Sequence, residues 1–460
     1  MSTLIGEFHP LLEKGWRPVF AQERTLDRAM QHALVLPCVY GRRTISRAIC
    51  ALGREQEDWS AEYKLFSRSP WQSGSLFNPV IDDYVVRYPV GFIAAAFDDT
   101  KLAKTGKRIA TAFWQRDPMS PPFHTNLVYG LRFLQASLLY PFYREGDFSA
   151  RALPAMFQEV PVVKKPGKRA SIEDRQAYRL ACKQHNLSTQ TLDAMRGLRQ
   201  RLDQAGAQAR SLLATMDGSF CNKTIFKAKL ERIELLARCR KDARLCFPAP
   251  PGSRRRYAPQ VFTPEQVRQN EEVPWHEASV YFGGTWRKLR HKEIGGMLWK
   301  RGAGTRPLRL IVLAPVPYRL SRRARLNYRD PAYLLTTDLA TSVDLLLQSY
   351  LDRWQIEVNH RDEKDLLGVG QAQVRSPQSV SRQPAFVVAC YSLLQIAALR
   401  AFGPGRTSDY PDRPKWRQDA AKRPSCLDIL ALLRKEYIET SGWLSPNRSV
   451  IQNLTLYANT

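Results

Sequence analysis

Apolar residues in the first 85 positions recur at helical spacing. One segment places them three or four residues apart before a glycine ends it (Ile45, Ile49, Leu52 and Gly53). A helix fits this spacing because one turn takes about 3.6 residues. We therefore expect residues 1–85 to form a helical, DNA-binding N-terminal region. Its arginines fit two interpretations equally well: a DNA-end recognition module built like a helix-turn-helix, and a helical cap with solvated charges (Arg42, Arg43, Arg47 and Arg54).

The pattern changes after Pro89, where short apolar runs replace the helical spacing. Three runs joined by short turns predict an antiparallel meander (residues 90–97, 109–114 and 129–140). A helix, a strand, a further helix and a strand are expected next (188–205, 212–216, from Asn222, and 233–237). Three strands, a helix, a strand and a helix is the order of an RNase H-like core. We assign its first part to residues 86–246.

The chain becomes rich in Pro, Gly, Trp and Arg over residues 247–342. Short apolar runs there predict strands within a β-rich insertion (278–282, 308–314 and 333–336). Helical patterning returns over 343–402, with one helix expected over 343–367, and would supply the helical second part of the core. Residues 403–460 are expected to form a helical tail with its last helix near 427–437. The expected fold class is thus α/β: an RNase H-like catalytic core interrupted by a β-rich insertion, with helical N-terminal and C-terminal regions.

The charge of the chain favours a polyanionic partner. Lys and Arg number 70 against 43 Asp and Glu, a net charge of +27 over 460 residues. Nucleic acid fits this excess because each cation placed on a phosphate releases a counterion. The sequence shows no targeting segment. Its longest near-apolar stretch, 386–399, is too short to span a bilayer and predicts a buried core helix. Eight scattered cysteines without a CxxC pair argue against zinc and fit a reducing cytoplasm.

One helical segment singles out a carboxylate among cations. At about 100° per residue, four side chains share an arc of roughly 60° (Tyr350, Arg353, Glu357 and Lys364). The neighbouring acids Asp352, Asp362 and Glu363 fall outside it. A carboxylate that binds metal at a phosphate can use such cations to hold the phosphate oxygens. An Arg–Glu pair four residues apart is also common on a solvated helix face, so spacing alone leaves both interpretations open.

The spacing Tyr, two residues, Arg, three residues, Glu, six residues, Lys resembles the signature of DDE-type cut-and-paste insertion-sequence transposases. The resemblance covers roughly residues 90–401 and does not extend into the N-terminal region. It implies a DNA transposase that cleaves phosphodiester bonds at the ends of a mobile element and transfers the 3′-OH ends to target DNA. It also implies that Glu357 is the third metal ligand, and that Tyr350, Arg353 and Lys364 bind phosphates of the DNA ends.

The same family has two upstream aspartates, each at the end of a strand. The first lies in Phe97-Asp98-Asp99-Thr100, where Asp98 and Asp99 point to opposite faces of the strand. Similar proteins carry the ligand directly before the Thr, which favours Asp99 and leaves Asp98 as the alternative. The second is Asp217, which follows the apolar run 212–216. On local sequence alone, both motifs also fit ordinary turns.

Carboxylate oxygens suit Mg²⁺, for which Mn²⁺ can substitute, and two ions about 4 Å apart would activate the nucleophile and stabilise the leaving alkoxide. Asp99 would bridge the ions, with Asp217 and Glu357 each completing one. The expected partners are double-stranded DNA (transposon ends and target) and a second copy in a DNA-bound homodimer. No membrane or nucleotide cofactor is expected. Two alternatives stay open: a transposase-derived DNA-binding protein without catalysis, and a nuclease that cuts without joining.

Overall fold

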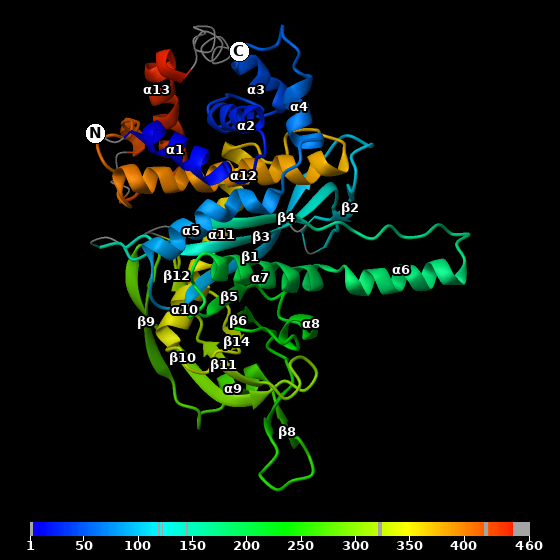
Figure 1. Ribbon diagram of the computed structural model, residues 1–460. Coiled ribbons are helices and arrows are strands. Elements are labelled where there is room, and N and C mark those ends of the chain that lie inside the picture. Colours follow the sequence, from blue (N-terminus) through cyan, green and yellow to red (C-terminus); the bar gives the residue numbers. More distant parts are fainter. Residues whose placement is uncertain are drawn as a thin grey trace.

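The computed structural model describes residues 3–117, 120–121, 123–143, 146–320, 324–417 and 422–444, and it is a mixed α/β structure (Figure 1). A layer of helices from the two ends of the described chain lies along one long helix, with a large mixed sheet beneath it. The expected α/β class with helices at both ends is therefore confirmed at this level.

The first part of the sheet is built from six strands. They are β1 (Ile93–Ala103), β2 (Phe113–Arg116), β3 (Leu127–Pro141), β4 (Ala150–Glu159), β5 (Leu212–Met216) and β6 (Ile233–Arg238). β3 pairs antiparallel with β1, β2 and β4, whereas β1, β5 and β6 run parallel to one another. The short parallel strand β5 is buried at every position, as its largely apolar sequence favours, and its one polar residue, Thr215, donates its hydroxyl to the backbone oxygen of Ala95.

The strands of the expected insertion continue the same sheet. β6 is followed in sheet order by β14 (Ala332–Thr336), β11 (Pro307–Leu313), β10 (Thr285–Leu298), β7 (Leu245–Pro248) and β8 (Tyr257–Phe262), and β9 (His276–Phe282) pairs with β10. A separate small pair is formed by β12 (Pro317–Tyr318) and β13 (Asn327–Tyr328). The short helix α9 (Pro264–Gln269) lies between β8 and β9.

Helices enter the sheet region between its strands. α6 (Ile172–Gln184) and α7 (Leu187–Gln204) precede β5, and α8 (Lys223–Phe226) precedes β6. After β14 come α10 (Val343–Asp352), α11 (Gln355–Arg361), the π-helical turn η2 (Asp362–Leu366) and α12 (Pro377–Phe402). The helix expected over 343–367 is thus three successive segments, which turn at Arg353 and Trp354.

The N-terminal helices pack against α12. They are α1 (Leu4–Trp16), α2 (Glu23–Val35), α3 (Ile45–Ala51), α4 (Ser60–Ser67), the 3₁₀ turn η1 (Ser73–Phe77) and α5 (Asn78–Arg87). Trp16, Phe66 and Trp71 surround Phe386 of α12, with ring centroids 5.1 to 6.5 Å away. One hydrophobic core runs from these helices into the sheet.

The described C-terminal region contains a short 3₁₀ turn, η3 (Lys415–Arg417), and α13 (Cys426–Leu444). Both carboxylate oxygens of Glu436 in α13 accept backbone N–H groups at the start of α1, from Leu4 at 2.9 Å and Ile5 at 2.8 Å. The two ends of the described chain are thereby joined. The expected last helix, near 427–437, lies within α13, and the part of the tail from 445 to 460 lies outside the described residues.

α12 is long and apolar enough to cross a membrane by length and composition, the one such helix among the described residues. Most of its apolar window is buried inside the protein, and the core helix of a globular domain meets the same criteria. It contains the stretch 386–399 that the sequence predicts to be a buried helix, and every residue of that stretch is buried. That prediction is confirmed.

Candidate active site

Three parallel strands bring polar residues to one level at their carboxyl ends. Phe97 of β1 pairs with Met216 of β5, and Met216 pairs with Ala237 of β6. The next residue on each strand is therefore Asp98, Asp217 and Arg238. Because parallel pairing of β1 with β5 ends here while β1 continues along β3, Asp98 stands at the edge where the sheet opens.

Asp98 lies close to one acidic and one basic side chain, Asp217 and Arg353. Burial and the nearby Asp217 carboxylate raise its pKa to about 7, although Arg353 opposes the shift. The Oδ2 atom of Asp98 is 3.9 Å from Nη1 of Arg353. Two carboxylates that disfavour each other's charge are a common arrangement around a bound cation, because a cation removes the repulsion.

Asp99 points away from this group, as alternation along a strand requires. Its Oδ2 atom accepts a hydrogen bond of 2.7 Å from Nε of Arg132 on β3, an ion pair in which the Asp99 side chain is 14% exposed and that of Arg132 30%. The two adjacent aspartates are thus separated by the strand: Asp98 faces Asp217 and Arg353, and Asp99 faces Arg132.

Asp217 begins the turn that follows β5. Its Oδ1 atom accepts hydrogen bonds from the backbone N–H of Ser219 at 2.9 Å and from the Ser219 hydroxyl at 2.7 Å. Asn222 then caps α8 by accepting from the N–H groups of Thr224 and Ile225. The predicted strand, Asp-Gly turn and helix are therefore present, and one oxygen of Asp217 makes these local bonds.

Arg353 occupies the junction between α10 and α11. Its guanidinium is 3.5 Å from Oε1 of Glu357 and 5.7 Å from the ring centre of Tyr350. Burial raises the pKa of Glu357, Arg353 lowers it, and Asp217 raises it further. The side chain of Glu357 is 37% exposed, whereas that of Arg353 is 10% exposed. Three of the four residues that share one helix face, Tyr350, Arg353 and Glu357, therefore lie near Asp98 or Asp217.

Lys364 reaches the same region from η2. Burial lowers its pKa, while Asp98 and Asp99 are among the acids that raise it. The neighbouring His360 is buried, and burial together with Lys364 lowers its pKa to about 3, so it is neutral at pH 7. A neutral, buried His360 fits a packing role.

A buried polar network fixes α11 against the sheet. Asn359 donates to the backbone oxygen of Ala152 at 2.9 Å and to the Tyr391 hydroxyl at 3.1 Å. Its side-chain oxygen accepts from Ser137 at 3.1 Å and from Gln135 at 3.4 Å. Because Asn359 is two residues after Glu357, these bonds set where the Glu357 side chain leaves the helix.

The guanidinium of Arg353 has hydrogen-bond donors that the protein itself does not use. Two buried nitrogens of Arg353, Nε and Nη1, make no hydrogen bond. Unpaired buried guanidinium N–H groups are costly, and phosphate oxygens would satisfy them. Within the described residues, no three His, Cys, Asp or Glu side chains already stand close enough together to hold a metal ion. A cation held by Asp98, Asp217 and Glu357 together would therefore require these side chains to come closer to one another.

Arg238 is a site residue that the sequence reasoning did not single out. It is level with Asp217 at the end of β6, and it lowers the pKa of Tyr350, which burial raises. The strand register could have predicted this position. Arg238 ends β6, which runs parallel to β5, so it lies at the same edge of the sheet as Asp217. Arg132 was missed for a different reason: its contact with Asp99 depends on the face of the sheet to which the Asp99 side chain points.

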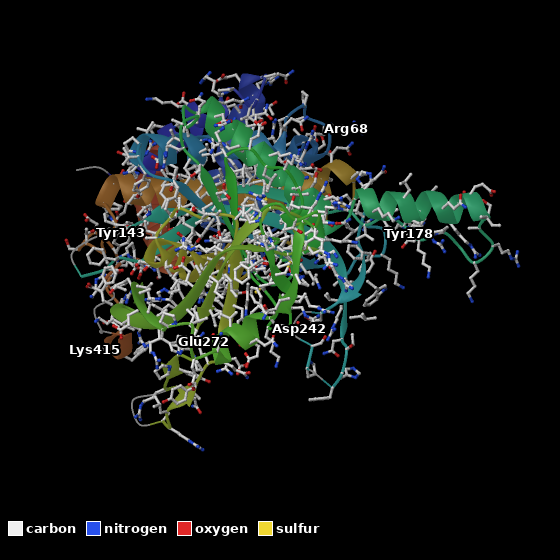
Figure 2. The ribbon with its side chains drawn as sticks, turned by 90° about the horizontal axis from the view of Figure 1, so that it is seen from below. Arg68, Tyr143, Tyr178, Asp242, Glu272 and Lys415 are labelled. Atoms are coloured by element: carbon white, nitrogen blue, oxygen red, sulfur yellow. The ribbon has the colours of Figure 1, made fainter. Side chains whose placement is uncertain are left out.

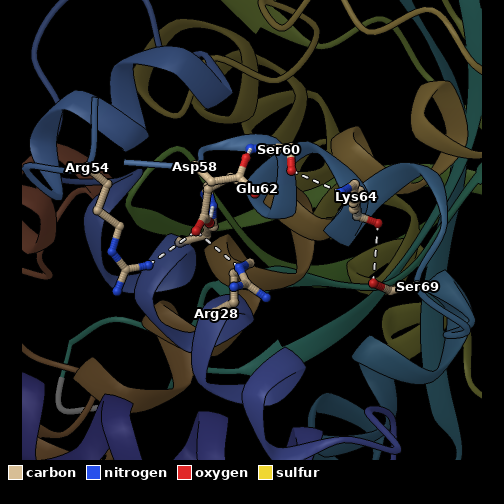
Figure 3. A network of polar contacts seen from close by, with 8 residues as sticks. Arg28, Arg54, Asp58, Ser60, Glu62, Lys64 and Ser69 are labelled. Carbon is tan, nitrogen blue, oxygen red and sulfur yellow. Dashed lines mark hydrogen bonds and ion pairs between the residues drawn. The ribbon is translucent and has the colours of Figure 1, made fainter. Parts of the chain in front are cut away.

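The arginines of the N-terminal region have largely structural partners. Arg54 and Arg28 both donate to Glu62, at 3.2 and 3.1 Å (Figure 3). Arg43 is buried, and its backbone N–H donates to Gln371 at 2.7 Å. Arg42 is exposed and lines a surface groove of about 520 Å³ with Arg375 and Ser376. These contacts favour the interpretation of Arg43 and Arg54 as part of a helical cap.

Comparison with known proteins yields no relative: no protein-family model matches this sequence, and neither does any curated protein.

Proposed function

We propose that this protein is a DDE-type DNA transposase, an enzyme that cleaves the ends of a mobile element and transfers the 3′-OH ends to target DNA. The observation that carries the proposal is the meeting of three acids from distant segments around one buried arginine. Asp98, Asp217 and Glu357 each interact with Arg353 or with one another. A solvated helix face would not require β1, β5 and α11 to present acids to the same place.

The topology supports an RNase H-like core as part of this proposal. Five strands lie in the order β4-β3-β1-β5-β6. β3 is antiparallel to both β4 and β1, whereas β1, β5 and β6 run parallel. An RNase H-like core has this arrangement of three antiparallel strands followed by two crossover strands. In open sheets of this kind, ligands bind beyond the carboxyl ends of the parallel strands. Asp98 and Asp217 lie there.

The geometry favours Asp98 over Asp99 as the first ligand. Asp98 faces Asp217 and Arg353, whereas Asp99 is engaged by Arg132. We therefore propose Asp98, Asp217 and Glu357 as the metal ligands, for Mg²⁺ or for Mn²⁺ in its place. When bound, the ions would make water or a 3′-OH nucleophilic and stabilise the departing oxygen.

The cations around these acids would position the DNA. Nε and Nη1 of Arg353, which make no hydrogen bond, are suited to a phosphate beside the reacting one. Tyr350, Lys364 and Arg238 extend the same surface. Arg353 also has a second role, since it partly neutralises Asp98 and Glu357 before any cation arrives. As in the sequence-based expectation, the proposed partners are double-stranded DNA and a second copy in a DNA-bound homodimer, in the cytoplasm.

The test is Mg²⁺-dependent cleavage of DNA that carries the terminal repeats flanking this protein's gene. We expect cleavage by the wild type and none by Glu357→Ala, with binding to the same DNA retained. Glu363→Ala is not a suitable control because Glu363 is buried, so exposed Glu439→Ala serves as the matched variant and should cleave normally. Tight binding without cleavage by the wild type would instead support a DNA-binding relic, and cleavage by Glu357→Ala would refute the site.

A further inference from the structure

An arm projects from the body of the protein just before α7. It consists of an extended segment, residues 161–170, and the helix α6, which returns beside it (Figure 1). The helix that carries Tyr178 stands clear of the body in the second view as well (Figure 2). α6 has 13 residues and none of them is buried. We call residues 161–186 the arm.

The arm has a defined local structure despite its exposure. Ser171 and Asp174 form a capping box at the start of α6, and Arg175 donates to the backbone oxygen of Lys168 at 2.9 Å. An isolated helix shorter than about 12–15 residues is marginal in water. Because no residue of α6 is buried, the helix lacks the tertiary packing that usually stabilises a helix of this length. A bound partner would supply that packing.

The charges of the arm indicate the chemistry of that partner. Seven cations lie on it (Lys164, Lys165, Lys168, Arg169, Arg175, Arg179 and Lys183). At about 100° per residue, Arg175, Arg179 and Lys183 fall within an arc of roughly 80° on α6. None of these three forms an ion pair within the described residues. The acids of the arm, Glu173 and Asp174, are confined to the first turn.

The apolar residues of α6 do not form a matching stripe. By the same geometry, Ile172, Tyr178 and Leu180 spread over roughly 200° of the helix circumference. A membrane surface or a coiled-coil partner requires apolar residues gathered on one face. The helix therefore offers a cationic face and no apolar face.

We propose that the arm binds the phosphate backbone of double-stranded DNA, away from the candidate active site; that the polyanion is DNA rests on the proposed function. Cations four residues apart advance ~6 Å each along the helix. Duplex DNA carries one negative charge per ~1.7 Å of its axis, so each cation meets a phosphate without needing a base sequence. The arm would thus lengthen the DNA contact and leave sequence recognition to other parts of the protein.

The experiment measures binding of the full-length protein to a short fluorescent duplex without terminal repeats, in the absence of divalent metal, at several salt concentrations. The variant is Arg175→Gln/Arg179→Gln/Lys183→Gln. Glutamine keeps good helix propensity, and no residue of α6 is buried, so the fold should persist. We expect binding about tenfold weaker or more at moderate salt, and a log–log salt slope smaller by up to about 2.7, or about 0.9 for each lost phosphate contact.

A matched control removes the same three charges elsewhere. Arg17, Arg196 and Arg240 are exposed and form ion pairs with Glu13, Asp193 and Asp242. The Arg17→Gln/Arg196→Gln/Arg240→Gln variant should bind the duplex with the wild-type salt slope. An arm variant that keeps that slope, or equal weakening in both variants, would overturn the proposal.

The outcome is separable from that of the proposed function. If the wild type does not cleave its terminal repeats but the arm variant loses duplex affinity, the transposase proposal fails and the arm proposal stands. If the wild type cleaves and the arm variant binds as the wild type does, the arm proposal alone fails.

Discussion

Among single residues, Asp98 and Asp99 allow the sharpest test of the candidate site. Asp98→Asn should reduce Mg²⁺-dependent cleavage at least about a hundredfold, because loss even of a residue that only supports a metal ligand costs about 10–100-fold. Asp99→Asn removes a partly exposed ion pair with Arg132, worth up to about 1 kcal/mol of stability, and should leave cleavage nearly unchanged. Single-turnover cleavage with equal DNA occupancy measures both. The reverse pattern would restore Asp99 as the ligand.

Sequence alone could not choose between these two aspartates. Strand alternation places them on opposite faces, but which face receives α10 and α11 is a long-range property. The family resemblance favoured Asp99, whereas the contact with Arg353 and the nearby Asp217 carboxylate favour Asp98. Glu357, Arg353 and Tyr350 were easier to predict as a group, because neighbours on one helix face are fixed by local geometry even though the helix turns at Arg353.

At the scale of elements, Glu62 joins α2, the loop after α3, and α4. It is buried and accepts from Arg28 and Arg54 and lies 2.6 Å from Nε2 of His32 (Figure 3 shows the two arginines). Burial alone would raise its pKa, but these partners hold the pKa at about 2, below its ordinary value of 4.5. A depressed folded-state pKa means that the ionised form stabilises the folded state.

The stabilisation should therefore be complete above about pH 4.5 and disappear as the pH falls toward 2. The shift corresponds to on the order of 3 kcal/mol of unfolding free energy. Denaturant unfolding of the wild type and Glu62→Gln should differ most near neutral pH, and the difference should shrink across this window. Exposed Glu57→Gln provides the control. A difference that does not change with pH would show that the ionised carboxylate is not what stabilises these helices.

Elements differed in how far the sequence predicted them. β5, with four buried apolar residues and the buried Thr215, was predicted at its observed bounds. β10 was missed because its buried positions include His291 and Lys292, which the sequence presents as part of a charged run. Lys292 is buried because its ammonium donates to the backbone oxygen of Asn270 and lies 4.8 Å from the ring centre of Trp275. Such partners come from distant segments, so the local pattern cannot show them.

At the scale of the whole molecule, the packing of the N-terminal helices against α12 joins the two ends of the fold. Trp16, Phe66, Trp71 and Phe386 are each at most 3% exposed and pack ring against ring. Burial of one such side chain contributes about 2 kcal/mol or more. Four of them together compare with the entire net stability of a domain, about 5–15 kcal/mol. The helices of residues 1–87 therefore cover a core that α12 shares with the sheet.

This packing predicts how the protein behaves when the chain is cut between residues 87 and 88. A chain that begins at Tyr88 should aggregate or lose its cooperative thermal transition, because Phe386 and its apolar neighbours on α12 become exposed to water. The fragment 1–87 should show little helical circular dichroism on its own, since it loses the same contacts and the Glu436 cap on α1. Mixing the two pieces should restore helicity only if they reassociate. A fragment 1–87 that folds and binds DNA alone would instead establish the independent DNA-binding module that its arginines allow, and the packing on α12 would then be a docking contact between separate domains.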